Sequence, residues 1–229
     1  FELIAGQSPY KSPTDMGVNM AGNCIVDDAV CCEASRKEIV RRYYKCLCQQ
    51  KITGTAKESE RYKLELLMNQ AGVSVQDRAV RNAALDKEEQ TDGPSAAIEL
   101  PDGTIVTGKT SALLGPMAGA LLNALKHLTG IDKETDLVSP QAIKDLKTVY
   151  LGSKNPRLHT DEVLIALSAS AEDNVLARQA MEKLPELRGC DAHCTVLLSS
   201  VDEQICNRLG MYLTCEPKYE EASRLYHKN

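Results

Sequence analysis

The sequence predicts an α/β fold that is rich in helices and contains a small mixed β-sheet. Apolar residues recur at the i, i+3, i+4, i+7 spacing of a helix in several segments, for example over residues 58–71. Residues 96–107 instead combine Thr, Ile and Val with a Pro-Asp-Gly turn, which predicts a β-hairpin. Two further strands are predicted at 193–199 and 211–215, and the helix expected between them implies that they run parallel.

Residues 1–26 are rich in Gly, Pro, Ser and Asn, and their Ser-Pro pairs disfavour regular helix. We expect a loop here that connects to a missing N-terminal domain. A helical subdomain is predicted over 27–92, and Gly72 is a suitable C-terminal cap within it. Its helices are predicted over 27–50, 58–71 and 74–90. On the first helix, the residues expected to face the core are Ala29, Cys32, Ile39, Tyr43 and Leu47.

Residues 93–229 are predicted to form an α/β domain that begins with the hairpin. A strongly apolar helix follows the hairpin. The pair Ser139-Pro140 starts another helix, because serine caps a helix well and proline fits its first turn. A polar loop at 152–158 then leads to the last helices. Besides the one that starts at Ser139, the helices of this domain are predicted over 112–129, 160–171, 174–184 and 201–209.

Charge and hydropathy exclude several classes of protein. The 27 basic and 32 acidic residues give a net charge of -5 and are interleaved, so no basic stripe predicts a nucleic-acid partner. No apolar run reaches the roughly 18–20 residues of a membrane span, and no signal peptide opens the chain. We therefore expect a cytoplasmic protein with neither a nucleic-acid nor a membrane partner.

The nine cysteines are interpreted as reduced thiols that serve as small core residues, because no secretory signal accompanies them. Cys190, His193 and Cys194 lie close in sequence to one another, which raises the alternative of a zinc site. No C-x2-C pair supports it, and Cys194 is expected inside a strand. No metal ligand is therefore assigned, no cofactor is named, and a metal role for this group stays open.

The segment Gly103–Thr110 matches the phosphate-loop pattern G-x4-G-K-[ST]. Its four middle residues are β-branched or favour strands, and they resist the left-handed geometry that such a loop requires. An arm of the hairpin explains them better. Lys109, next to the start of the following helix, is still a candidate for binding an anion.

The polar loop and the helix start that follows it combine Lys, Asn, Arg, His and two carboxylates within 152–162. This density of donors points to anion binding and to acid–base chemistry. The simpler alternative is a polar loop in which Thr160 caps a helix. The candidate anion-binding residues are Lys109, Asn155, Arg157 and His159, with His193 and Asp15 as weaker candidates. No catalytic constellation stands out, so whether the chain is an enzyme is left open.

Four stretches of the sequence resemble a bacterial family known as domain-of-unknown-function family 1846, in its C-terminal half. The stretches are Ser8–Met20, Glu99–Lys109, Leu151–His159 and the pair formed by Asp191–His193 and Glu216–Pro217. The resemblance implies a cytoplasmic protein about twice this length, whose N-terminal half carries its own glycine-rich segment. Some members are labelled ATP-dependent peptidases, but this sequence shows no peptidase constellation. Four cysteines depart from the expected residues: Cys24, Cys31, Cys32 and Cys194.

The residues and the resemblance together lead to one main hypothesis. The chain is expected to be the C-terminal substrate-binding or catalytic-support domain of a protein whose nucleotide-binding N-terminal half is absent. Its ligand would be a phosphorylated small molecule. Its partners would be its own N-terminal domain and further copies of itself in a homo-oligomer. The alternative is a structural or oligomerisation module without catalytic residues, and an independent P-loop NTPase is the third reading.

Overall fold

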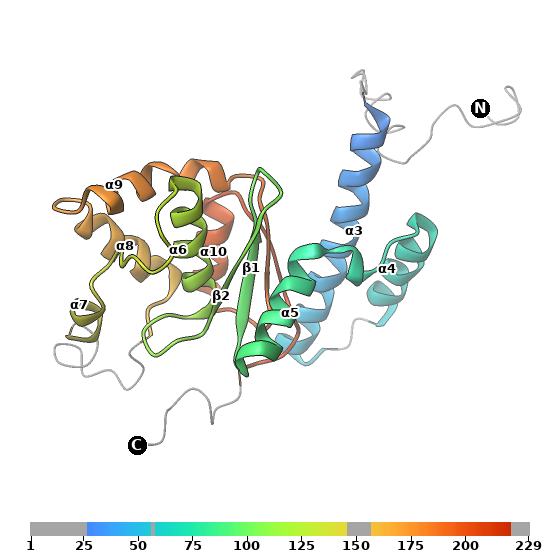
Figure 1. The fold of residues 1–229 in the computed structure, drawn as a ribbon. Helices are drawn as coiled ribbons and strands as arrows, with labels where there is room; N and C mark the ends of the chain where they lie inside the picture. The colour runs from blue at the N-terminus through green and yellow to red at the C-terminus, as the bar shows by residue number, and fades with distance from the viewer. Residues whose placement is uncertain (1–26, 56–57, 146–156, 221–229) are drawn as a thin grey trace, which may run out of the picture.

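A four-stranded sheet of order β2-β1-β3-β4 organises the protein (Figure 1). The structure is a computed structural model that describes residues 27–55, 58–145 and 157–220. Strand β1 is antiparallel to both β2 and β3, whereas β3 and β4 run parallel. The strands are β1 Ser95–Glu99, β2 Ile105–Lys109, β3 Asp191–Cys194 and β4 Tyr212–Cys215. The prediction of a helix-rich α/β fold with a small mixed sheet is confirmed.

The strand boundaries differ from the prediction in two places. The hairpin ends later than predicted because β2 extends to Lys109, and the segment Gly103–Thr110 lies on this arm of the hairpin instead of forming a phosphate loop. Strand β3 runs from Asp191 to Cys194 and so overlaps the predicted strand at 193–199 only at His193 and Cys194. After Cys194 the regular strand ends, although the Thr195 N–H still donates to the Ser95 carbonyl at 2.9 Å, and the Ser199 hydroxyl then caps the next helix.

The helices follow the predicted order with shifted ends. Helix α6 starts later than predicted, at Pro116, after a loop. The predicted helix at 74–90 is divided, because Ser74 and Asp77 close a short turn and Arg78 then adopts an extended conformation. The helical elements are α3 Asp28–Thr53, α4 Glu58–Ala71, η1 Val75–Asp77, α5 Ala79–Thr91, α6 Pro116–Thr129, α7 Pro140–Lys144, α8 Thr160–Ser170, α9 Val175–Glu182, η3 Leu184–Leu187 and α10 Ser200–Arg208.

Helices cover both faces of the sheet, and the side chains of β1 pack against helices on both sides. Its successive side chains point to opposite faces. Ala96 and Ile98 pack into the main core together with α6, whereas Ala97 packs against Val80 and Ala84 on the α5 side. The burial of β1 on both faces explains why Ala96, Ala97 and Ile98 follow one another without an alternating polar residue.

Helix α6 crosses β2 at very short range. A Cβ added to Gly108 would lie only 2.0 Å from the backbone nitrogen of Ala120, so only glycine fits at this position. The helix is buried almost all around, between the sheet on one side and α8 and α9 on the other. This contact fixes where the first turn of α6 lies, which matters for the site described below.

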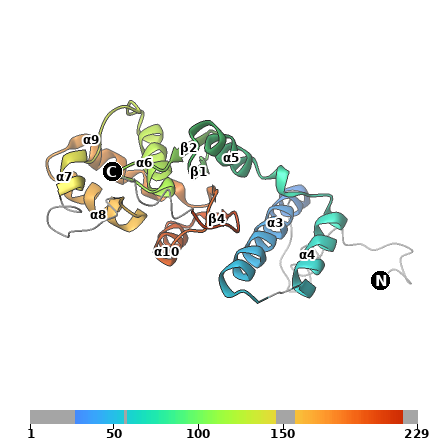
Figure 2. The ribbon, with the colours of Figure 1, turned by 90° about the horizontal axis from the view of Figure 1, so that it is seen from below.

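Helices α3 and α4 lie side by side at one end of the molecule, away from α7, α8 and α9 at the other end (Figure 2). The buried residues of α3 are Val40, Tyr44 and Cys46, not the predicted set that included Ile39 and Tyr43. Ile39 and Tyr43 are partly buried and pack against Val40 and Tyr44, and because α3 contacts both α4 and β4 it has more than one apolar side. The predicted division of the chain at residue 92 stays a prediction.

Candidate functional site

A small cavity lies beyond the carboxyl ends of the parallel strands β3 and β4, the edge at which ligands bind in many α/β proteins. Its volume is about 110 Å³. We call it the Arg157 cavity. Its walls come from the start of α6, from the segment before α8, from the segment between β3 and α10, and from the segment after β4. The lining residues are Gly115–Ala118, Arg157, Leu158, His159, Val196–Ser199, Asp202 and Glu220.

Three helices begin at this cavity. Helix α6 begins after Gly115, and no side chain caps its first turn. Helix α8 begins after His159, and α10 begins after Ser199. Each helix has at least eight residues, and the N–H groups of a first turn carry partial positive charge. The Asp202 carboxylate already accepts from the Thr160 N–H at the start of α8, and the Ser199 hydroxyl accepts from the Asp202 N–H of α10, so α6 is the one of these three whose start has no side-chain cap. The backbone therefore makes this cavity a favourable place for negative charge.

Two predicted residues reach the cavity because the chain is extended around Leu158. The Leu158 N–H donates to the Leu113 carbonyl at 2.7 Å, and the Leu158 carbonyl accepts from Gly115 at 3.1 Å. In an extended segment, residues two apart point to the same side. Arg157 and His159, on either side of the buried Leu158, therefore line the cavity, and Leu158 also contributes to its wall.

Arg157 brings a positive charge into this cavity. Its side chain is only 9% exposed, and its Nη1 donates to Glu220 Oε1 at 2.7 Å. Guanidinium groups bind carboxylate and phosphate oxygens strongly, because charge and geometry both match. A carboxylate of the protein therefore already occupies one anion-binding position. Glu220 lies outside any strand or helix, in the segment that follows β4.

Asp202 joins the starts of α8 and α10. Its Oδ1 accepts from the backbone N–H of Thr160 at 2.8 Å and from the Thr160 hydroxyl at 2.7 Å. Its Oδ2 accepts from the Ser199 hydroxyl at 2.7 Å and lies 3.1 Å from Nδ1 of His159. Burial alone raises the pKa of Asp202, but the hydrogen bonds from His159, Thr160 and Ser199 outweigh it and hold the pKa well below its usual range. Asp202 is therefore a charged group at neutral pH.

The structure brings some predicted site residues together and leaves others apart. Arg157 and His159 share the Arg157 cavity. Lys109 is exposed and lines a different cavity of about 240 Å³, beside Lys126. His193 is completely buried in the sheet. The two other candidates, Asn155 and Asp15, lie outside the described residues.

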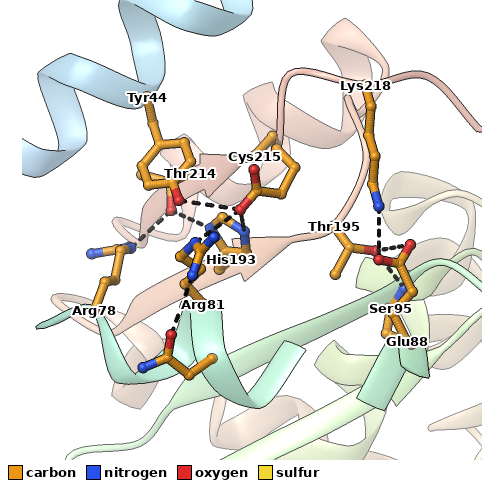
Figure 3. A network of polar contacts seen from close by, with 12 residues as sticks. Tyr44, Arg78, Arg81, Glu88, Ser95, His193, Thr195, Thr214, Cys215 and Lys218 are labelled. Atoms are coloured by element: carbon orange, nitrogen blue, oxygen red, sulfur yellow. Dashed lines mark hydrogen bonds and ion pairs between the residues drawn. The ribbon is translucent and has the colours of Figure 1, made fainter. Parts of the chain in front are cut away.

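His193 belongs to a polar network that links the sheet to α3 and α5 (Figure 3). Its Nδ1 lies 2.8 Å from the Thr214 hydroxyl, and its Nε2 lies 3.5 Å from Glu216 Oε1. The same Glu216 oxygen accepts from the Tyr44 hydroxyl at 3.1 Å and from Arg81 Nε at 3.0 Å. Because Nε2 faces a carboxylate, the proton of a neutral ring belongs on Nε2 and the Thr214 hydroxyl donates to Nδ1. Burial lowers the pKa of His193, and the nearby Glu216 carboxylate opposes this shift.

A larger cavity, of about 440 Å³, is lined by residues of α3, of the start of α5 and of the sheet. Its charges converge on Asp191. Arg78 donates to Asp191 Oδ1 at 2.7 Å, while Arg41 and Lys37 approach at 3.6 and 3.7 Å. Asp191 lies on β3, and three basic side chains hold its carboxylate, so it is harder to displace than the carboxylate of Glu220. The Arg157 cavity is the better candidate, because Glu220, which pairs with its arginine, is free of such a constraint.

The cysteines contribute little chemistry to either site. None of the eight described cysteines belongs to a disulfide, and five of them are buried, which fits the interpretation of small core residues. Burial raises the pKa of Cys194 and of Cys206 to about 12, so these thiols stay protonated and are poor nucleophiles. Within the described ranges, no group of three or more His, Cys, Asp or Glu side chains could hold a metal ion.

Sequence reasoning missed Asp202, Glu220 and the start of α6. One signal for Asp202 is present, because Ser199 and Asp202 have the S-x-x-D spacing of a helix start. That spacing explains the cap of α10 but not the contact with His159. No signal in the sequence indicates that Glu220 meets Arg157, since 63 residues separate them.

Two family models match the chain. "Domain of unknown function DUF1846, C-terminal" matches residues 76–226, and "Domain of unknown function DUF1846, N-terminal" matches residues 1–72. The expectation that the chain is only the C-terminal half, working with an absent nucleotide-binding half, is therefore wrong. The family's N-terminal model extends into this chain as far as the end of the α3–α4 pair.

Curated relatives match along nearly the whole chain. A "UPF0371 protein" of Corynebacterium glutamicum is 54% identical over 230 residues, which cover 99% of this chain and 46% of the relative. A "UPF0371 protein" of Streptococcus thermophilus is 49% identical over the same shares of both proteins. The chain thus spans about half the length of these bacterial relatives.

Within the described residues, no helix is both long and apolar enough to cross a membrane.

Proposed function

The chain belongs to the DUF1846 family, whose name assigns no activity, and we propose that it binds the anionic group of a phosphorylated small molecule in the Arg157 cavity. The observation that carries the proposal is the placement of a buried arginine where three helices begin. Each of these features favours an oxyanion, and together they surround one position from several sides.

The size of the cavity limits what enters it. A volume of about 110 Å³ holds one small anionic group, whereas pockets that enclose a whole drug-sized ligand have roughly 300–1,000 Å³. We therefore expect the phosphate group to bind inside, with the rest of the ligand outside the mouth of the cavity. The apolar lining residues Met117, Leu158 and Val196 exclude water around the bound group, which strengthens its interaction with Arg157.

Glu220 competes with the ligand in this proposal. Its carboxylate bonds to Arg157 at 2.7 Å, so an incoming phosphate must replace it. The displacement is feasible because Glu220 lies outside any regular element and its side chain is 15% exposed. A phosphate group carries up to two negative charges and has more acceptor oxygens than a carboxylate, which favours it over Glu220 as the partner of Arg157.

Titration calorimetry with inorganic phosphate tests the proposal. The chain is expected to bind phosphate, and Arg157→Gln is expected to weaken binding by roughly tenfold or more, because a charge-assisted hydrogen bond is lost. Arg42→Gln is the matched control. This arginine is exposed and pairs with Glu38 on α3, away from the cavity, so its loss should leave phosphate affinity unchanged. Equal affinity of the chain and of Arg157→Gln would overturn the proposal.

The homo-oligomer and the cytoplasmic location stay predictions. Light scattering on the purified chain measures the first, and fractionation of cells that produce it measures the second.

A further inference from the structure

His159 and Asp202 form a pair that resembles the orienting half of an acid–base site. Nδ1 of His159 lies 3.1 Å from Asp202 Oδ2, while the ring is 48% exposed and the carboxylate side chain only 7%. A buried carboxylate that accepts from Nδ1–H holds an imidazole in one orientation and one tautomer. The proton that can then be exchanged is on Nε2, the nitrogen on the other side of the ring.

Asp202 is well suited to hold the ring without taking its proton. Four donors surround it: the backbone N–H and hydroxyl of Thr160, the hydroxyl of Ser199, and His159 itself. Hydrogen bonds to the charged form stabilise that form, and the pKa of Asp202 is lowered accordingly. The carboxylate is also fixed in position, because two of its donors belong to the start of α8 and a third caps α10.

The other charged groups around His159 determine how it responds to a ligand. Arg157 is two residues before it, and Glu220 pairs with Arg157. Glu162 of α8 accepts from the backbone N–H of His159 at 2.9 Å. Helix α6 contributes only uncharged residues, Gly115–Ala118, to the cavity. Among the described residues that line the cavity, Arg157 is the one lysine or arginine, so a bound dianion adds more negative charge than this side chain balances, and a positive charge on the imidazole becomes favourable.

We propose that His159 takes up a proton when a tetrahedral oxyanion binds in the Arg157 cavity, with Asp202 as the positioning residue. The inference rests on the proposed function and adds to it a proton-coupled mode of binding. In the bound state, Nδ1–H donates to Asp202 and Nε2–H donates to an oxygen of the ligand. The proton comes from solvent, and no covalent bond forms or breaks. Such a group is also the acid or base that chemistry on a phosphate ester requires.

Sulfate is the appropriate probe, because unlike phosphate it has no proton that titrates near neutral pH. Calorimetric titrations of the chain with sulfate at pH 7, in two buffers of different ionisation enthalpy, give the number of protons taken up on binding. The chain is expected to take up a fraction of a proton, and His159→Gln is expected to take up none. The affinity of the chain should rise on the order of tenfold from pH 8 to pH 6, whereas that of His159→Gln should stay nearly constant.

Two further variants separate the roles of the residues. Asp202→Asn should reduce the proton uptake, because the amide can hold the ring in the opposite tautomer. Since this variant also loses a helix contact, its thermal melting is recorded, and His159→Gln serves as the independent test should it fail to fold. His127→Gln, an exposed histidine on α6, is the matched control and should behave like the unmodified chain.

Each outcome has one meaning. Binding without proton uptake, or uptake that persists in His159→Gln, overturns the inference and leaves the proposed function intact. Binding of phosphate but not of sulfate also overturns it, since a protonated His159 should hold either dianion. If neither ion binds, the proposed function itself fails, and this inference fails with it.

Discussion

Arg78 and Asp191 form a buried ion pair that joins the start of α5 to the sheet, with Nη1 and Oδ1 at 2.7 Å. The same guanidinium also donates to the Thr214 hydroxyl and to the carbonyl oxygens of Ala192 and Tyr212. One side chain thus satisfies acceptors on both parallel strands. This is why Arg78 interrupts the helix predicted over 74–90: its extended backbone directs the side chain at the sheet.

Removing this arginine should destabilise the fold strongly. Arg78→Ala removes the shortest ion pair of a buried carboxylate, which Arg41 and Lys37 approach only at 3.6 and 3.7 Å, and it takes a donor from two strand carbonyls. We therefore expect a loss of about 3–5 kcal/mol in the free energy of unfolding. Urea denaturation measures it. Arg42→Ala, which breaks an exposed pair with Glu38, should cost no more than about 1 kcal/mol. Equal losses in the two variants would contradict the structural role of Arg78.

The close approach of α6 to β2 predicts a severe effect at Gly108. An added Cβ meets backbone atoms of Gly119 and Ala120, which cannot move without shifting the helix. Gly108→Ala should therefore lower stability by about 3 kcal/mol or more, or prevent folding. Gly93→Ala is the control, because a Cβ there has only an ordinary contact at 3.8 Å. Thermal melting of both variants compares them, and an unchanged melting temperature for Gly108→Ala would refute the close contact.

His193 should make stability depend on pH between neutrality and mild acid. Burial lowers its pKa in the folded protein below the ordinary value of 6.5. The unfolded chain then binds more protons in this range, so stability is full above about pH 6.5 and falls as the pH drops through the lowered pKa. His193→Gln should reduce that slope. Urea midpoints at pH 7.5 and 5.5 measure it, and a slope equal to that of the unmodified chain would contradict the prediction.

Asp202 should make the stability of the fold depend on pH in more acidic solution. Its lowered pKa means that its contribution is present above the ordinary value of 3.8 and is lost as the pH falls below it. Asp202→Asn should cost about 1–3 kcal/mol at pH 7, because charge-assisted hydrogen bonds become neutral ones. The difference from the unmodified chain should shrink at pH 3. Guanidinium unfolding at both pH values measures this difference, and a constant one would show that the charge of Asp202 is unimportant.

Glu220 should weaken anion binding in the unmodified chain. Glu220→Gln removes the carboxylate that occupies Arg157, so phosphate should bind on the order of tenfold more tightly. Glu186→Gln, which removes a carboxylate from an exposed pair with Lys183, is the matched control and should leave the affinity unchanged. Calorimetry with phosphate compares the three proteins. Weaker binding in Glu220→Gln would mean that this carboxylate supports the site instead of competing for it.

Local features of the sequence were enough to predict the types and order of the elements. The period of apolar residues identified the helices, and the Pro-Asp-Gly turn identified the hairpin, because both signals involve residues that are close in the chain. The predicted ends of helices and strands were wrong where a contact with a distant residue decides the backbone conformation. Arg78 is extended, and its side chain donates to acceptors on β3 and β4. Strand β3 ends at Cys194, and Ser199 caps α10, which begins at Ser200.

The residues of the candidate site also form two groups, those that the sequence indicated and those that only the structure revealed. The sequence by itself indicated Arg157 and His159, because polar residues at a helix start are a local signal. Only the tertiary structure added Asp202, which is 43 residues from His159, and Glu220, which is 63 residues from Arg157. Their contacts depend on the parallel pairing of β3 with β4 and on the packing of α6 against β2. Such pairings bring distant segments together through burial and backbone hydrogen bonds, and neither leaves a pattern among neighbouring residues.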